Sequence, residues 1–150
     1  MNKIRMIALA ACMAATLDAS AQEQEIRLFS HRGGRMEHDE NTLSAFQASY
    51  DAGYRGFETD IRMTRDGALV ITHDSSLERT TNGTGTVEEK TEAEIRRLRT
   101  KQGNKVLFLD ELLEFLEGKE GLYVEFEMKT KPEALYPEER LHAYCDKLYD

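Results

Sequence analysis

One stretch, Phe57–Asp74, constrains the fold of this 150-residue chain more than any other, because it alternates apolar and acidic residues and then turns. Its first part, together with the preceding Gly56, reads GFETDIRM and predicts a β-strand, since successive side chains of a strand point to opposite faces. Glu58 and Asp60 would then share one face, and Phe57 and Ile61 the other. Two neighbouring carboxylates repel each other unless a cation lies between them. The pair is therefore either a metal site or an ordinary solvated face.

A hairpin is predicted to follow this strand. Asp66-Gly67 is a strong turn signal, and residues 68–72 (ALVIT) predict a second short strand that ends at His73 and Asp74. A histidine that faces a carboxylate pair is typical of sites that bind metals and transfer protons. The stretch therefore indicates chemistry as well as a strand.

Another strand is predicted upstream, at residues 25–29 (EIRLF). It leads to His31, Arg32 and two glycines, which let the backbone turn sharply and approach a ligand closely. The carboxyl end of a strand is where barrels and open sheets of the α/β type bind ligands. A solvent-exposed His-Arg loop is the alternative on local grounds.

Helices are predicted from capping residues and apolar periodicity. The first begins at Asn41 or Thr42 and stops at Gly53, and it returns the chain to the strand at residues 56–63, which indicates a parallel strand–helix–strand unit. The remaining predicted elements are a short helix after the capping box Thr91–Glu94, helices at residues 110–116 and 138–149, and a strand at residues 122–129.

Composition argues against nucleic-acid binding. The chain is 40% hydrophobic and 32% charged, and its formal net charge is −8. Its densest basic run, residues 96–105, has the spacing of a solvated helical face rather than of a basic patch. A chain of 150 residues is long enough for one domain with a core of its own.

Residues 1–21 predict a secretory signal peptide, because basic residues precede an apolar run and residues 19–21 (ASA) form a cleavage pattern. The mature chain is expected to start near Gln22 and to be exported, to the periplasm or outside the cell. The apolar run is too short for a stable membrane span. An alternative is a lipoprotein box (LAAC), in which Cys12 would be acylated. Cys145 is expected to be a packed apolar residue.

A series of short motifs runs from about Ile26 to Lys129. The motifs are His31-Arg32-Gly33-Gly34, Glu40-Asn41-Thr42, Glu58-Thr59-Asp60, Thr64-Arg65-Asp66-Gly67, His73-Asp74, Leu77-Glu78-Arg79-Thr80-Thr81, Gly85 and Glu127-Met128-Lys129. In this order and spacing they resemble the glycerophosphodiester phosphodiesterase family. The resemblance implies an α/β fold of the TIM-barrel-like (β/α)8 type. It also implies a small insertion after the second barrel strand, which carries the second histidine.

The same resemblance implies a reaction and roles for seven residues. The reaction is the hydrolysis of a small-molecule glycerophosphodiester to glycerol 3-phosphate and an alcohol, through a cyclic phosphate. A divalent cation, Ca²⁺ or Mg²⁺, suits a site made of oxygen ligands alone. The implied roles are a cation site of Glu58, Asp60 and Glu127; a general acid and base, His31 and His73; and a phosphate clamp of Arg32 and Lys129.

The length of the chain leaves two functions open. A TIM barrel needs about 250 residues, so residues 22–150 are expected to hold only the first three or so strand–helix units of an incomplete domain. The strand at residues 122–129 would then have an open edge, which predicts self-association. The chain is either a secreted metal-dependent phosphodiesterase or a truncated, inactive family member that at most binds metal or phosphate.

Overall fold

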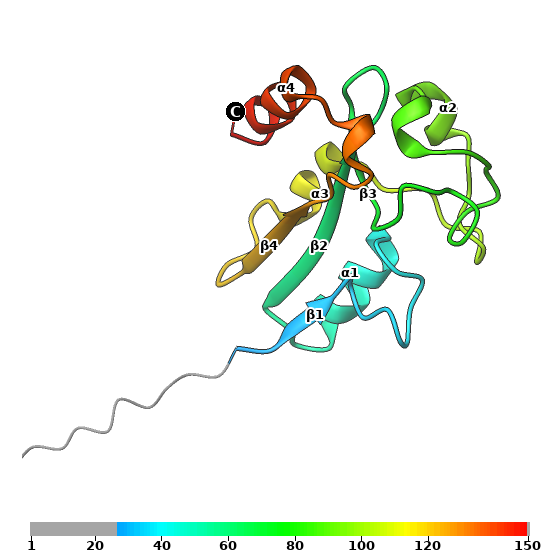
Figure 1. Ribbon diagram of the computed structural model, residues 1–150. Helices are drawn as coiled ribbons and strands as arrows, with labels where there is room; N and C mark the ends of the chain where they lie inside the picture. Colours follow the sequence, from blue (N-terminus) through cyan, green and yellow to red (C-terminus); the bar gives the residue numbers. More distant parts are fainter. Residues whose placement is uncertain (1–26, 150) are drawn as a thin grey trace, which may run out of the picture.

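The computed structural model describes residues 27–149, which form an α/β fold built on one four-stranded sheet (Figure 1). The elements of these residues are β1 (Phe29–His31), α1 (Leu43–Asp51), β2 (Gly56–Met63), β3 (Leu69–Ile71), the 3-10 turn η1 (Val87–Glu89), α2 (Glu92–Arg96), α3 (Leu109–Leu116), β4 (Tyr123–Met128), the 3-10 turn η2 (Glu133–Leu135) and α4 (Glu138–Tyr149). The predicted signal peptide and Cys12 lie outside the described residues. Within residues 27–149, no helix has the length and apolar character needed to cross a bilayer.

β2 is the centre of the sheet, and it runs parallel to β1 on one side and to β4 on the other. The register places Ser30 opposite Phe57, and Asp60 opposite Glu127. The antiparallel β3 pairs with the last residues of β2 after a turn at Gly67, whose φ of 89° strains any residue with a Cβ atom. The predicted parallel strand–helix–strand unit and the hairpin after it are thus confirmed.

β1 lies later in the chain than predicted. The sequence indicated a strand over residues 25–29, of which residues 25 and 26 lie outside the described part of the chain, whereas β1 covers Phe29–His31. β1 can pair only where β2 offers a partner, and β2 begins at Gly56, which lies opposite Phe29. The shift makes His31 the last residue of β1, so its side chain starts from the carboxyl end of the strand.

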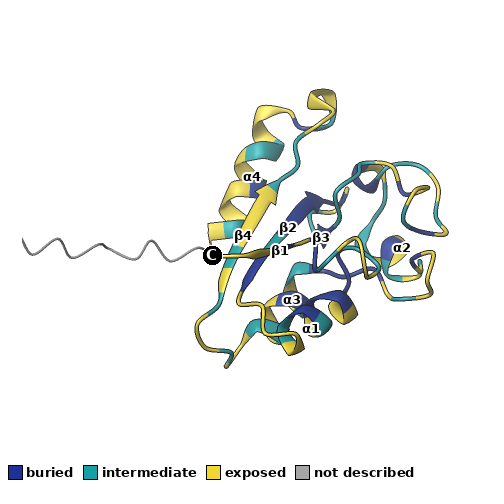
Figure 2. Cartoon of the chain, turned by 90° about the horizontal axis from the view of Figure 1, so that it is seen from below, coloured by how far each residue is buried: buried dark blue, intermediate teal, exposed yellow. Residues whose placement is uncertain are grey.

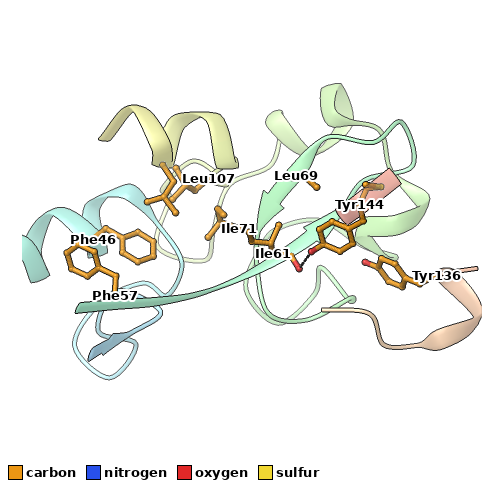
Figure 3. Close-up of a cluster of buried hydrophobic side chains, with 10 residues drawn as sticks. Phe46, Phe57, Ile61, Leu69, Ile71, Leu107, Tyr136 and Tyr144 are labelled. Atoms are coloured by element: carbon orange, nitrogen blue, oxygen red, sulfur yellow. Dashed lines mark hydrogen bonds between the residues drawn. The ribbon is translucent and has the colours of Figure 1, made fainter. Parts of the chain in front are cut away.

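Helices α1, α3 and α4 cover one face of the sheet. Phe57 and Ile61 of β2 are fully buried on this face, together with Phe46 of α1 and Tyr144 of α4 (Figure 3). The hydroxyl group of Tyr144 donates a hydrogen bond to the carbonyl oxygen of Ile61. Cys145 is exposed, and the prediction that it is packed is wrong. Tyr144 points into the core, and because successive residues of a helix point about 100° apart, Cys145 points away from it.

The segment between β2 and α3 contains β3, η1 and α2 and forms a small core of its own. Val70, Ile95 and Phe108 are buried within it. α2 begins with the predicted capping box, in which Thr91 and Glu94 each bond the backbone N–H group of the other. This segment occupies the place of the insertion expected after the second strand, and it carries the second predicted histidine.

β4 is an edge strand, and most of its residues are exposed (Figure 2). Among residues 27–149, it pairs with β2 alone. Its other edge therefore presents backbone groups that a further strand could pair with. The face of the sheet opposite the helices carries the acidic side chains.

Candidate active site

The open face of the sheet brings the three predicted acidic ligands together. Glu58 and Asp60 lie on β2, and Glu127 lies on β4 opposite Asp60. One carboxylate oxygen from each residue lies within 4.8 Å of the other two. Asp60 is fully buried, Glu58 is partly buried and Glu127 is exposed. The parallel pairing of β2 with β4 creates this cluster, because it places Glu127 directly opposite Asp60 on the neighbouring strand, although the two residues are distant in the sequence.

Asp60 is the buried centre of the cluster. Its Oδ2 lies 3.0 Å from Nε of Arg32 and accepts a hydrogen bond of 3.0 Å from Nδ2 of Asn41. Its Oδ1 lies 3.1 Å from Nζ of Lys129, yet this buried oxygen accepts no aligned hydrogen bond from residues 27–149. Buried carboxylates persist when they are paired or bound to a metal. A buried oxygen of this kind beside two further carboxylates fits Ca²⁺ or Mg²⁺.

Burial and neighbouring charges shift the pKa values of Glu58 and Lys129. Burial, and then the negative charge of Asp60, raises the pKa of Glu58. Burial lowers the pKa of Lys129, but contacts with Glu127 and Asp60 raise it overall. Nζ of Lys129 lies 2.5 Å from Oε1 of Glu127. A nearby positive charge stabilises the ionised form of a carboxyl group. A bound cation would therefore offset the burial and the repulsion from Asp60 that raise the pKa of Glu58.

His31 borders the carboxylate cluster. Its Nε2 lies 3.5 Å from Oε2 of Glu58, and 49% of its side chain is exposed. Burial, followed by the positive charges of Arg32 and Arg35, lowers the pKa of His31. A lowered pKa keeps the imidazole neutral near pH 7, and a neutral imidazole can accept a proton.

His73 follows β3 and is oriented by the residue after it. Nδ1 of His73 lies 2.6 Å from Oδ1 of Asp74. A hydrogen bond from Arg79 lowers the pKa of Asp74 to about 2, so this carboxyl group is ionised near neutral pH. An ionised carboxylate only accepts hydrogen bonds, and Nδ1 of His73 must therefore carry the proton. Nε2 is then the nitrogen of His73 that can exchange a proton with a substrate.

A chain of charged contacts links the second histidine to the cluster. Arg79 contacts Asp74 and donates hydrogen bonds of 2.9 and 2.7 Å to the two carboxylate oxygens of Glu40. Glu40 accepts a further hydrogen bond of 3.2 Å from Arg32. Because Arg32 also contacts Asp60, the buried carboxylate and the orienting Asp74 belong to one network. The seven predicted site residues are thus connected.

Two residues that hold Asp60 have strained backbones. Arg32 and Asn41 are the non-glycine residues with positive φ among residues 27–149, at 53° and 57°. Asn41 also accepts a hydrogen bond of 2.9 Å from the hydroxyl group of Thr59. Such strain is concentrated at functional sites. Four further residues, which the motifs contain but which were not predicted to act in the site, belong to it: Glu40, Asn41, Asp74 and Arg79.

Comparison with known proteins shows which family has this arrangement of motifs. The model of the Glycerophosphoryl diester phosphodiesterase family matches residues 31–148. The chain belongs to this family. The match includes the catalytic, phosphate-binding and metal-binding candidates together with the insertion after β2.

Relatives of the phosphodiesterase family match a large part of the chain. A glycerophosphodiester phosphodiesterase of Caldanaerobacter subterraneus subsp. tengcongensis is 37% identical in an alignment of 123 positions that covers 76% of this chain and 50% of the relative. A glycerophosphodiester phosphodiesterase of Bacillus altitudinis is 32% identical in an alignment of 111 positions that covers 69% of this chain and 45% of the relative. The chain spans about half the length of these relatives.

Solved structures of phosphodiesterases have the same fold. The glycerophosphodiester phosphodiesterase of Agrobacterium tumefaciens is 30% identical, with a TM-score of 0.67, over 84% of this chain and 64% of that one. An Oleispira antarctica phosphodiesterase, solved in complex with the product sn-glycerol-3-phosphate, is 29% identical, with a TM-score of 0.71, over 83% of this chain and 52% of that one. The predicted TIM-barrel-like fold is confirmed, and the sheet of this chain corresponds to part of such a barrel.

Proposed function

We propose that this chain is a metal-dependent phosphodiesterase that hydrolyses glycerophosphodiesters to glycerol 3-phosphate and an alcohol. The observation that carries the proposal is the convergence of Glu58, Asp60 and Glu127 within 4.8 Å, beside a histidine and two cationic side chains. Membership of the family supports it. So does the sn-glycerol-3-phosphate product in the Oleispira antarctica structure.

The three carboxylates are the residues that would hold a divalent cation, Ca²⁺ or Mg²⁺. When bound, such a cation neutralises charge on the phosphoryl oxygens of the substrate. Lys129 and Arg32 would supply the remaining positive charge to the phosphate group. Arg32 is fixed by Glu40 and Asp60, so its guanidinium group would act from a set position.

The two histidines would move the protons. One of them removes the proton of the glycerol 2-hydroxyl group, whose oxygen attacks phosphorus and forms a cyclic phosphate. The leaving alcohol takes a proton from the other histidine. Water then opens the ring with the proton transfers reversed, and glycerol 3-phosphate is formed. Asp74 would hold His73 in one tautomer throughout these steps.

Turnover of glycerophosphocholine and glycerophosphoethanolamine by the purified chain tests this proposal. His31→Ala and His73→Ala should each lower turnover by about 10² to 10⁴-fold, the usual contribution of a positioned acid or base. His38→Ala is the matched control, because His38 is exposed and should leave turnover unchanged. Turnover near the wild-type rate in either of the first two variants would contradict the assignment.

A second candidate is a protein that binds metal or phosphate without turnover. The open edge of β4 and the exposure of Glu127 favour it, because both leave the site accessible to water. The same edge is expected to promote self-association. Size-exclusion chromatography of the chain measures that association, and the assay above separates the two candidates. For either candidate, we propose that residues 1–21 direct the export of the chain to the periplasm or outside the cell.

A further inference from the structure

A buried polar network lies beside the site and contains none of its seven predicted residues. Its members are Arg62 on β2, Glu88 in η1 and Tyr136 after η2, and each is less than a tenth exposed. We propose that Arg62 is a positioning residue that sets the place of His73 relative to the cation site and the phosphate clamp. This inference deepens the proposed function and rests on it.

Arg62 joins three segments that each carry a site residue. It belongs to β2, two residues after Asp60 and on the same face of the strand. Its Nε donates a hydrogen bond of 2.8 Å to the carbonyl oxygen of His73. Its Nη1 donates a hydrogen bond of 2.8 Å to the carbonyl oxygen of Lys131, two residues after Lys129. One guanidinium group therefore connects β2, which carries two of the predicted cation ligands, to the segment of His73 and to the segment of Lys129.

Glu88 completes the network as the counterion of Arg62. Its Oε1 accepts hydrogen bonds of 2.7 Å from Arg62 and 2.6 Å from the hydroxyl group of Tyr136. Its Oε2 accepts a hydrogen bond of 2.6 Å from the hydroxyl group of Ser75. Burial raises the pKa of Glu88, but the bonds from Ser75, Tyr136 and Arg62 lower it overall. The carboxylate is thus ionised in the interior and bonded on both oxygens.

The network holds the His73 segment from both ends. Arg62 bonds the carbonyl group of His73, and Glu88 bonds the side chain of Ser75, two residues later. The backbone N–H group of Val87 also donates to the carbonyl oxygen of Ser75, at 2.8 Å. Because Glu88 and Tyr136 share a hydrogen bond, the insertion and the segment after β4 cannot move apart without breaking it. The network therefore fixes the distance between the insertion, which carries His73, and the segment that follows β4.

The geometry of arginine explains why another cation would not serve. The guanidinium group is planar and presents its N–H groups in a rigid fork, whereas lysine is a point charge on a flexible stem. Arg62→Lys could keep the charge opposite Glu88 but could not reach both carbonyl groups as well. A catalytic group displaced by about 1 Å can lose about 10²-fold in rate. Arg62→Lys is therefore expected to lower kcat by about that factor.

The test compares kcat, KM and the metal concentration that gives half-maximal activity. In Arg62→Lys, kcat on glycerophosphocholine should fall about 100-fold, while KM and the metal midpoint stay within about threefold of wild type. Arg96→Lys is the control, because Arg96 also bridges several carboxylates, but its partners Glu92, Asp110 and Glu111 are not site residues. Unchanged kcat in Arg62→Lys, or equal changes in kcat, KM and the metal midpoint, would overturn the proposal.

A second variant keeps the proposal testable if Arg62→Lys does not fold. Tyr136→Phe removes one hydroxyl group and keeps the ring that stacks on Tyr144. It should lower kcat less than Arg62→Lys does, again with KM and the metal midpoint unchanged. A kcat equal to that of wild type would count against a positioning role.

Hydrogen exchange separates the failure of this proposal from the failure of the proposed function. If the wild-type chain has no turnover, the proposed function fails, and amide exchange measured by mass spectrometry decides the inference alone. Tyr136→Phe should then accelerate exchange in residues 72–76 and 129–133 together, while Arg96→Lys changes neither segment. Acceleration of one segment or of neither would show that the network does not couple them.

Discussion

Asp74 connects His73 with Arg79, and its charge is expected to stabilise the fold. The hydrogen bond from Arg79, and then the one with His73, lowers the pKa of Asp74 from its ordinary value of 3.8 to about 2. A shift of this size corresponds to about 2 kcal/mol. Solvent screening reduces this to about 1 kcal/mol, because a quarter of Asp74 and half of Arg79 are exposed. Asp74→Asn should therefore lower the free energy of unfolding by about 1 kcal/mol at pH 7.

The difference between wild type and Asp74→Asn should disappear in acid. The pKa of Asp74 is lower in the folded chain than in the unfolded chain, so ionised Asp74 stabilises the fold above about pH 4. That stabilisation is lost as the pH falls through about 2. Urea denaturation in EDTA, followed by circular dichroism from pH 7 downward, measures the difference. Asp146→Asn, at an exposed position of α4, is the control and should change little. A loss in Asp74→Asn that is independent of pH would refute the reasoning, because it would arise from packing rather than charge.

Two further predictions concern the cation site and the loop before α1. Ca²⁺ or Mg²⁺ should raise the melting temperature of the wild-type chain, since a ligand present at 100 times its Kd adds about 2.7 kcal/mol to the free energy of unfolding. Asp60→Asn should lose that rise in scanning fluorimetry. Equal rises in both proteins would contradict the cation site. Gly33→Ala should cost more stability in urea than Gly53→Ala, because a Cβ atom at Gly33 would lie 2.9 Å from Cβ of Ala45 whereas Gly53 has open space. Both glycines have positive φ, so equal losses would show that backbone strain alone decides the effect.

The strand at the centre of the sheet could be predicted from the sequence because its pattern is local. Alternation over residues 56–63 placed Glu58 and Asp60 on the face opposite Phe57 and Ile61, as the structure has them. The first strand was placed too early, because a strand of three residues has little pattern of its own and its limits are set by its partner. Local periodicity thus fixes long elements better than short ones.

The connections within the site could not be predicted, because they join residues that are distant in the sequence. The motifs contain Glu40, Asp74 and Arg79, but only the folded chain shows that Arg79 bridges the two carboxylates. Glu88 lies in the run VEEK, which looks like a solvated acidic turn. Its burial follows from the packing of η1 against Arg62, 26 residues earlier.

Turnover of glycerophosphocholine before and after metal removal tests the central claim most directly. The purified wild-type chain should lose turnover in EDTA and regain it when Ca²⁺ or Mg²⁺ is returned in excess, because Glu58, Asp60 and Glu127 converge on one cation site. Asp60→Asn should regain little under the same conditions. Turnover that persists in EDTA, or that returns equally in wild type and Asp60→Asn, would contradict the account.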